Sequence, residues 1–176
     1  MKNQEIDWLL EHKYGGSKSQ AFYDDCKRLS LGEPLDYLIG WSDFLGCKIW
    51  LDNHPLIPRP ETEYWTEEAI KTIQQSKTLS LGLSDEAPRI LDLCAGSGCI
   101  GTAVLTHIPE SVVDFGELDA RLITTIKKNL AENITGGNQS HVFHTNLFSH
   151  IEGAYDFILT NPPYIDESLN RVQPEV

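Results

Sequence analysis

The sequence lacks any apolar run approaching the roughly 20 residues that a membrane-spanning helix needs. Its first seven residues include Glu5 and Asp7, in the region where a secretory signal would carry basic residues followed by an apolar stretch. The four cysteines include no C-x-x-C pair, and no export signal indicates an oxidising compartment. We therefore predict a cytoplasmic protein whose cysteines are reduced thiols.

Basic residues are also scarce. The chain carries 14 Lys and Arg against 26 Asp and Glu, which gives a formal net charge of -12. A protein that binds a phosphate backbone usually displays a basic stripe, because released counterions supply much of its affinity. Here the longest basic cluster is the pair Lys127-Lys128. The charge pattern therefore argues against direct nucleic-acid binding.

The histidines do not form a pattern typical of a metal site. His141 and His144 are three residues apart on a predicted strand, so their side chains should face opposite sides of the sheet. The other histidines are isolated in the sequence. We predict no metal ion.

Helical periodicity dominates the first part of the chain. Apolar spacing predicts helices over residues 4–14 and 19–30, a hairpin over 43–51 and a further helix over 61–75. Three prolines between the hairpin and the last helix predict a stiff connector, and residues 76–87 form a polar linker. We divide the chain into a helical N-terminal segment (1–42), a hairpin with a proline-rich connector (43–60) and a third domain (61–176).

Strands and helices alternate after Pro88. Strands are predicted over residues 89–93, 111–115, 141–144 and 155–160, with helices over 100–107 and 120–133. Such alternation favours a parallel sheet with right-handed crossover connections. The predicted fold class is α/β.

A glycine-rich loop follows the first of these strands, from Asp92 to Gly98. Glycines at a strand-to-helix turn let a ligand approach the main chain, and the helix start offers free N–H groups. With Gly101 they also match G-x-G-x-x-G, which is a weak signal alone and leaves a nicotinamide-dependent oxidoreductase as an alternative. Glu117, at the end of the next strand, is suited to binding ribose hydroxyls. Asp92 favours a cationic ligand, S-adenosylmethionine, over a pyrophosphate.

The segment Asn161-Pro162-Pro163-Tyr164 follows the last predicted strand, at the sheet edge where ligands bind in open α/β folds. Prolines donate no N–H, so the Asn161 and Pro162 carbonyl oxygens are left to accept hydrogen bonds. Two such acceptors would hold an amide or amino nitrogen with its lone pair directed at a methyl group. Tyr164 would stack on the flat acceptor. The segment therefore predicts methyl transfer to nitrogen, through orientation and stabilisation of developing positive charge.

These motifs together resemble a known family. Asn161-Pro162-Pro163-Tyr164 is similar to the amino-methyltransferase signature of class I S-adenosylmethionine-dependent enzymes. The segments 32–40 (GEPLDYLIG), 56–63 (LIPRPETE) and 161–166 (NPPYID) resemble the release factor glutamine methyltransferases (PrmC/HemK family). That resemblance implies a Rossmann-like parallel sheet and methylation of the glutamine side-chain amide (N5) in the Gly-Gly-Gln motif of peptide chain release factors. The release factor would be the protein partner, docked with help from the N-terminal helices.

The resemblance also implies roles for individual residues. The cofactor's methionine portion would lie against Cys94, Ala95, Gly96, Ser97 and Gly98, its ribose against Glu117, and its adenine beside Asn146 and Leu147. Asn161 and Pro162 would hold the glutamine amide, with Pro163 and Tyr164 beside it.

The chain departs from the family pattern at three points. Cys94 stands in place of a usual glycine and must accept that residue's backbone angles. Asn146 stands in place of a usual aspartate and keeps only an uncharged oxygen. The chain ends at Val176, soon after Tyr164, which predicts an incomplete sheet and a C-terminally truncated chain. A methyltransferase of DNA adenine N6 or cytosine N4 and an inactive fragment are the remaining alternatives.

Overall fold

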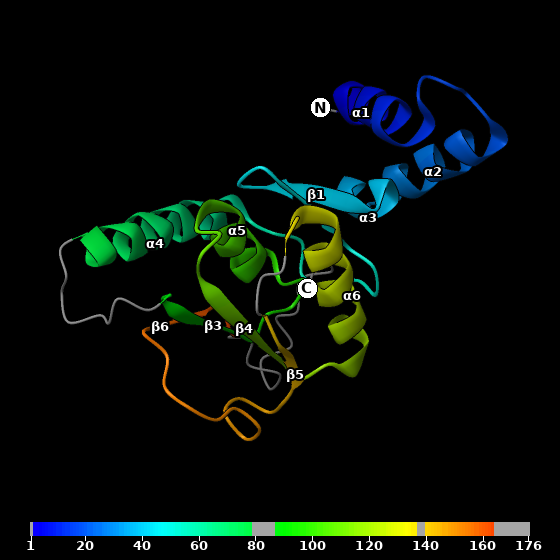
Figure 1. Cartoon of the computed structure of the whole chain (residues 1–176). Coiled ribbons are helices and arrows are strands. Elements are labelled where there is room, and N and C mark those ends of the chain that lie inside the picture. Colours follow the sequence, from blue (N-terminus) through cyan, green and yellow to red (C-terminus); the bar gives the residue numbers. More distant parts are fainter. Residues whose placement is uncertain (1, 79–86, 137–139, 164–176) are drawn as a thin grey trace.

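A computed structural model describes residues 2–78, 87–136 and 140–163 of the chain (Figure 1). The N-terminal part contains three helices, α1 (Lys2–Tyr14), α2 (Gln20–Ser30) and α3 (Leu35–Ile39). They enclose a small core of their own, in which Leu9, Phe22 and Leu38 are buried. The helices predicted over 4–14 and 19–30 are present. The sequence analysis missed α3, whose five residues are too few to show a helical period.

A buried carboxylate fixes the first two helices to each other. Asp25 is 5% exposed. It accepts hydrogen bonds from Lys13 Nζ at 2.6 Å, Tyr14 Oη at 2.6 Å and Arg28 Nη1 at 2.8 Å. Its pKa is lowered: burial alone would raise it, but the hydrogen bonds from Lys13 and Tyr14 outweigh that effect. The N-terminal helices are therefore joined by an ionic contact as well as by apolar packing.

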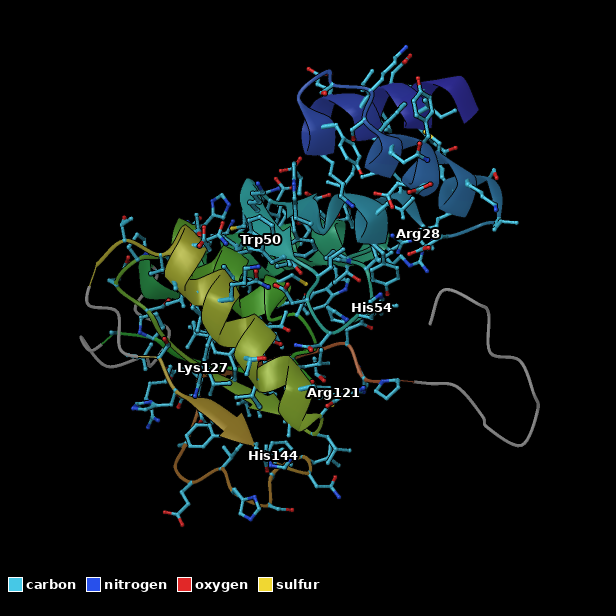
Figure 2. All side chains as sticks on the ribbon, turned by 90° about the vertical axis from the view of Figure 1, so that its right-hand side faces the viewer. Arg28, Trp50, His54, Arg121, Lys127 and His144 are labelled. Carbon is cyan, nitrogen blue, oxygen red and sulfur yellow. The ribbon has the colours of Figure 1, made fainter. Side chains whose placement is uncertain are left out.

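The hairpin consists of β1 (Trp41–Phe44) and β2 (Cys47–Trp50), which pair antiparallel. Its two-residue turn has positive φ at both Leu45 and Gly46, as the right-handed strand twist favours. The hairpin packs on α6 (Ala120–Asn133), and Figure 2 shows Trp50 of the hairpin beside this helix. The Asn129 side chain of α6 bonds to both the N–H and the C=O of Trp50. Asn129 Nδ2 also donates to Ser97 O at 2.9 Å, so this side chain connects the hairpin to the glycine loop.

The α/β prediction is confirmed. Strands β3 (Arg89–Leu93), β4 (Val112–Glu117), β5 (Val142–His144) and β6 (Phe157–Thr160) form a parallel sheet in the order β5-β4-β3-β6. Helices α4 (Pro60–Thr78), α5 (Cys99–His107) and α6 lie on the same face of this sheet (Figure 1). None of the helices in the described ranges is long and apolar enough to cross a membrane.

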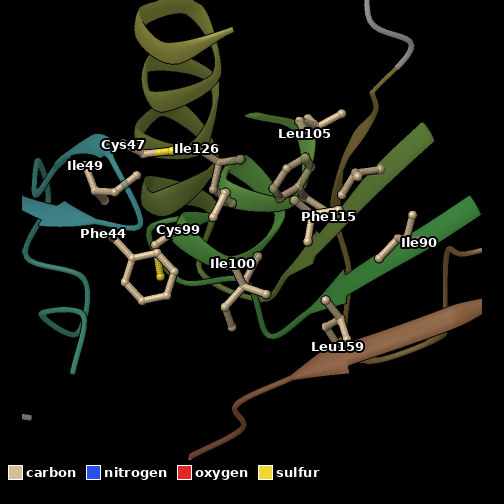
Figure 3. Close-up of a cluster of buried hydrophobic side chains, with 14 of the residues drawn as sticks. Phe44, Cys47, Ile49, Ile90, Cys99, Ile100, Leu105, Phe115, Ile126 and Leu159 are labelled. Carbon is tan, nitrogen blue, oxygen red and sulfur yellow. The ribbon is translucent and has the colours of Figure 1, made fainter. Parts of the chain in front are cut away.

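The main core lies between the sheet and these helices. Figure 3 shows Ile90, Phe115 and Leu159 of the sheet facing Ile100 and Leu105 of α5. A Cβ on Gly101 would lie 2.3 Å from Phe115 Cε1, so α5 contacts the sheet at its closest point through a residue without a side chain.

Three strands begin later than predicted, and the first of them, β4, begins at Val112 and extends to Glu117. β5 begins at Val142, because Asp114 Oδ1 accepts from both the backbone N–H and ring Nδ1 of His141. β6 begins at Phe157, and the hydroxyl of Tyr155 donates to Asp114 Oδ2 at 2.9 Å. Asp114 is 2% exposed, and it holds both segments just before their strands start.

Candidate active site

The glycine loop begins where β3 ends, in the middle of the sheet. Ala95 N–H donates to Gly116 O at 3.1 Å and Gly98 N–H donates to Ala95 O at 2.7 Å, so the turn is closed by backbone bonds. Gly96 has φ +58°, and a Cβ there would meet nothing within 4 Å. The main chain at Gly96 is therefore open to a ligand. Gly98 differs, because a Cβ there would lie 3.1 Å from the side chain of Ile126 on α6.

Cys94 occupies the left-handed region with φ +60°. A left-handed backbone was expected here, because Cys94 stands where the family usually has a glycine. The left-handed conformation costs an L-residue roughly 1–2 kcal/mol, and glycine avoids that cost. The thiol is partly buried, and burial raises its pKa although the nearby Thr160 side chain acts to lower it. Cys94 is therefore a strained residue at the base of the loop.

Replacing Cys94 by glycine is expected to raise the free energy of unfolding by about 1 kcal/mol, because the relieved strain exceeds the added chain entropy. Cys94→Ala is the matched control, since it removes the thiol but keeps the Cβ and the strain. Urea denaturation of both variants and the wild type measures the difference. Equal stability of the glycine and alanine variants would show that the left-handed conformation carries no cost here.

Glu117 is positioned for a bidentate role at the end of β4. Its side chain is largely buried, with 8% of the residue exposed. Oε2 accepts from Gly96 N–H at 2.7 Å and Oε1 accepts from Asp119 N–H at 2.8 Å. Each carboxylate oxygen has further lone-pair capacity, which two vicinal hydroxyls could use. The carboxylate is thus held by the glycine loop itself.

Asp92 lies beneath the loop and is fully buried. Its Oδ2 accepts from Gly101 N–H at 2.8 Å, while Oδ1 has no hydrogen-bond partner among the described residues. The pKa of Asp92 is raised to about 7, because burial and, to a smaller extent, the charge of Glu117 outweigh the lowering effect of the Gly101 hydrogen bond. Asp92 does not line the cleft described below. Its effect on a ligand is therefore electrostatic and acts through the loop.

The pKa of Asp92 has a consequence for stability. The folded state holds this proton up to about pH 7, whereas the unfolded chain releases it near pH 4. Stability should therefore fall as the pH rises between these values, by about 2 kcal/mol from pH 5 to pH 8. In Asp92→Asn this contribution is absent. The unfolding free energy of the variant relative to the wild type should therefore be higher at pH 8 than at pH 5. Urea denaturation at both pH values tests this, and a difference that is independent of pH contradicts it.

A cleft brings together three segments that are far apart in the sequence. It is lined by residues from the proline-rich connector and the start of α4, from the glycine loop with the start of α5, and from the end of β6: Leu56, Ile57, Pro58, Arg59, Thr62, Cys94, Ala95, Gly96, Ser97, Cys99, Ile100 and Asn161. The predicted loop residues Cys94 to Ser97 and Asn161 thus face one space, whereas Gly98 does not line it. Thr160 Oγ1 donates to Leu93 O at 2.7 Å, which fixes the end of β6 beside the end of β3.

The other predicted site residues do not line this cleft within the part of the chain that the structure describes. Pro162 and Pro163 are exposed directly after Asn161, and Tyr164 lies outside the described residues. Asn146 and Leu147 follow β5, near Glu117, whose register partner in β5 is His144. Both are exposed, and Leu147 has φ +50°. The structure therefore places them on the same edge of the sheet as Glu117, outside the cleft.

The connector side of the cleft was not predicted from the sequence. Asn161 Nδ2 donates to Thr62 Oγ1 at 3.2 Å, a contact between residues 99 positions apart. The only signal in the sequence was the segment LIPRPETE, which carried part of the family resemblance. Neither periodicity nor composition indicates that this segment and the end of β6 meet.

Comparisons with known proteins address the chemistry of this arrangement. Residues 74–173 match the family model for the methyltransferase small domain. The chain belongs to that family. Its cofactor, as predicted from the glycine loop, is S-adenosylmethionine. The match favours a methyltransferase over the nicotinamide-dependent alternative.

Individual relatives narrow the comparison. The release factor glutamine methyltransferase of Borreliella burgdorferi is 32% identical over 162 residues, covering 90% of this chain and 53% of the relative. A 4-amino-L-phenylalanine/4-methylamino-L-phenylalanine methyltransferase of Streptomyces pristinaespiralis is 29% identical, covering 95% and 55%. A solved ribosomal protein L11 methylase from Lactobacillus delbrueckii subsp. bulgaricus is 19% identical, with a TM-score of 0.49 over 65% of this chain and 52% of that one. The resemblance to release factor glutamine methyltransferases is thus confirmed at about 30% sequence identity. The chain spans about half the length of the curated relatives it matches.

The residues of this methyltransferase domain fit the cofactor. The main chain at Gly96 is open, and Glu117 presents two oriented oxygens beside it. The charge of Glu117 is one of the causes that raise the pKa of Asp92, so the Glu117 carboxylate contributes negative potential at the loop. That potential suits a positively charged sulfonium ligand and would repel a pyrophosphate.

Proposed function

We propose that this protein methylates the side-chain amide nitrogen of the glutamine in the Gly-Gly-Gln motif of peptide chain release factors. The observation that carries the proposal is the cleft in which Asn161 and the glycine loop from Cys94 to Ser97 face each other. A nitrogen held at Asn161 would lie next to the place where the cofactor's methionine portion is expected.

The proposed mechanism depends on orientation. When bound, S-adenosylmethionine supplies a methyl group on a positively charged sulfur. The Asn161 side-chain oxygen and the Pro162 carbonyl oxygen accept the two N–H groups of the substrate amide, because the prolines leave no competing donor. Held in this way, the nitrogen would present its lone pair to the methyl group, and the same acceptors would stabilise it as it becomes positive. It would then release one of its two protons, which leaves a neutral N-methyl amide. Tyr164 is proposed to cover the flat amide.

The choice of a release factor rests on relatives and on charge. The Borreliella burgdorferi relative is named for release factor glutamine methylation. The net charge of -12 disfavours a polyanionic substrate such as DNA. The N-terminal helices, which have their own core, are proposed to dock the protein substrate. We place this reaction in the cytoplasm.

A second candidate acceptor is an aromatic amine on a small molecule. The Streptomyces pristinaespiralis relative is named for methylation of 4-amino-L-phenylalanine and matches nearly the same share of the chain. Its acceptor also carries two N–H groups on a nitrogen whose lone pair is delocalised. The same pair of acceptors would hold it.

The test uses the full-length protein and S-adenosylmethionine labelled in the methyl group. It is incubated in parallel with a release factor, the same release factor with the Gly-Gly-Gln glutamine replaced by alanine, DNA and 4-amino-L-phenylalanine. Label is expected in the unmodified release factor alone. Label in DNA or in the free amino acid, without label in the release factor, overturns the proposed substrate.

A further inference from the structure

The side chain of Asn161 is held by a residue from another part of the chain. Its Nδ2 donates to Thr62 Oγ1 at 3.2 Å. Thr62 is 6% exposed, and both residues line the cleft. Within the part of the chain that the structure describes, this is the one hydrogen bond that the Asn161 side chain makes. Its Oδ1 is therefore available to a substrate.

Thr62 is itself firmly placed. It lies in the first turn of α4, where its C=O accepts from Thr66 Oγ1 at 2.7 Å. The next residue, Glu63, accepts from Leu45 N–H at 2.8 Å, which fixes the start of α4 to the hairpin turn. Farther along α4, Ile70 and Ile73 are buried in the main core. A β-branched threonine has few rotamers, so its hydroxyl has a defined position.

The two ends of a carboxamide have opposite hydrogen-bonding character. The Nδ2 end donates and the Oδ1 end accepts. With Nδ2 bonded to Thr62, the oxygen is the end left for the acceptor nitrogen, whose own hydrogens require an oxygen. A carboxamide rotated by half a turn would oppose N–H to N–H and would not hold the nitrogen.

We propose that Thr62 is a positioning residue, which anchors the Asn161 carboxamide through its Nδ2 while Oδ1 accepts from the substrate. The inference rests on the proposed function, since it assumes that Asn161 holds a nitrogen. Thr62 acts through Asn161 and does not touch the reacting atoms. The proposed methyl-transfer site would then include the start of α4 as well as the glycine loop and the segment that begins at Asn161.

Two variants at this position separate the hydroxyl from the rest of the side chain. Thr62→Val keeps the branched shape and removes the hydroxyl, while Thr62→Ser keeps the hydroxyl and removes the methyl group. In the full-length protein, Thr62→Val is expected to lower kcat for methyl transfer about 10-fold, the effect of one lost hydrogen bond. Thr62→Ser should stay within about 3-fold of the wild type. Isothermal titration with S-adenosylhomocysteine should show cofactor affinity unchanged in both.

If Thr62 only stabilised the fold, its two variants would behave differently. Valine and serine variants would then lose activity in proportion to their loss of thermal stability, and cofactor affinity would fall with it. Wild-type kcat in a folded Thr62→Val protein overturns the inference. So does an equal loss in the serine variant.

A second measurement does not depend on turnover. The side-chain NH₂ of Asn161, followed by ¹⁵N NMR, should exchange slowly with solvent in the wild type and in Thr62→Ser, and about 10-fold faster in Thr62→Val. An unchanged exchange rate of the Asn161 NH₂ in the valine variant would show that the Thr62 hydroxyl does not bond to it. If the wild type methylates no acceptor, the proposed function fails, and the exchange rates still decide whether Thr62 orients Asn161.

Discussion

Replacing Asn161 by alanine should lower kcat for methyl transfer by about 10²–10³-fold, because one of two oriented acceptors is lost at the nitrogen that becomes positive. Cofactor affinity should change little, since the ribose is expected at Glu117 and the open main chain at Gly96. A labelled-methyl assay on the full-length protein gives kcat, and titration with S-adenosylhomocysteine gives the dissociation constant.

Asn161→Asp is the matched control for this prediction. It has the same shape and keeps an acceptor oxygen toward the cleft, while the Thr62 hydroxyl can donate to its other oxygen. Its activity should therefore lie clearly above that of the alanine variant. Turnover by Asn161→Ala close to the wild-type value would remove this side chain from the mechanism.

Gly101→Ala should destabilise the fold by about 3 kcal/mol. In an ordinary helix the same change is stabilising by about 1 kcal/mol, because alanine has the higher helix propensity. Here the added Cβ would lie 2.3 Å from Phe115 Cε1, 2.6 Å from Phe115 Cζ and 3.0 Å from Val113 Cγ1. Phe115 is fully buried and cannot move aside without disturbing the core. Urea denaturation measures the loss.

A double-mutant cycle assigns that loss to the contact with Phe115. Phe115→Leu alone should cost about 1 kcal/mol or more through the space it leaves. Combined with Gly101→Ala, it should recover part of the stability, because the methyl group can occupy that space. Simple additivity of the two losses would show that the clash with Phe115 does not cause the effect.

Much of the fold could be predicted from local patterns. The strand Arg89–Leu93 and the helix Ala120–Asn133 have the predicted bounds, because each combines a clear apolar period with a distinct boundary. At the helix start this boundary is Asp119, which accepts from Arg121 N–H at 2.9 Å as an N-cap. The short helix α3 was missed because five residues cannot display a period.

The site was less predictable, because the residues that surround a side chain depend on tertiary packing and not on the local sequence. Asp92 was expected to act toward the ligand directly, yet it points beneath α5 and bonds to Gly101 N–H. Cys94 could be singled out because a non-glycine residue stood where the loop needs a left-handed backbone. The contact between Thr62 and Asn161 depends on how α4 packs, which no motif in either segment specifies.

The strand order β5-β4-β3-β6 also affects how the site is completed during synthesis. The ribosome releases β3, β4 and β5 before β6, so the central strand β3 first has a neighbour on only one side. Its other edge exposes unpaired backbone groups to any passing strand until Phe157–Thr160 emerges. That final pairing also brings Asn161 to the loop at the end of β3. Pairing of β6 therefore covers the free edge of β3 and brings Asn161 to the cleft in a single step.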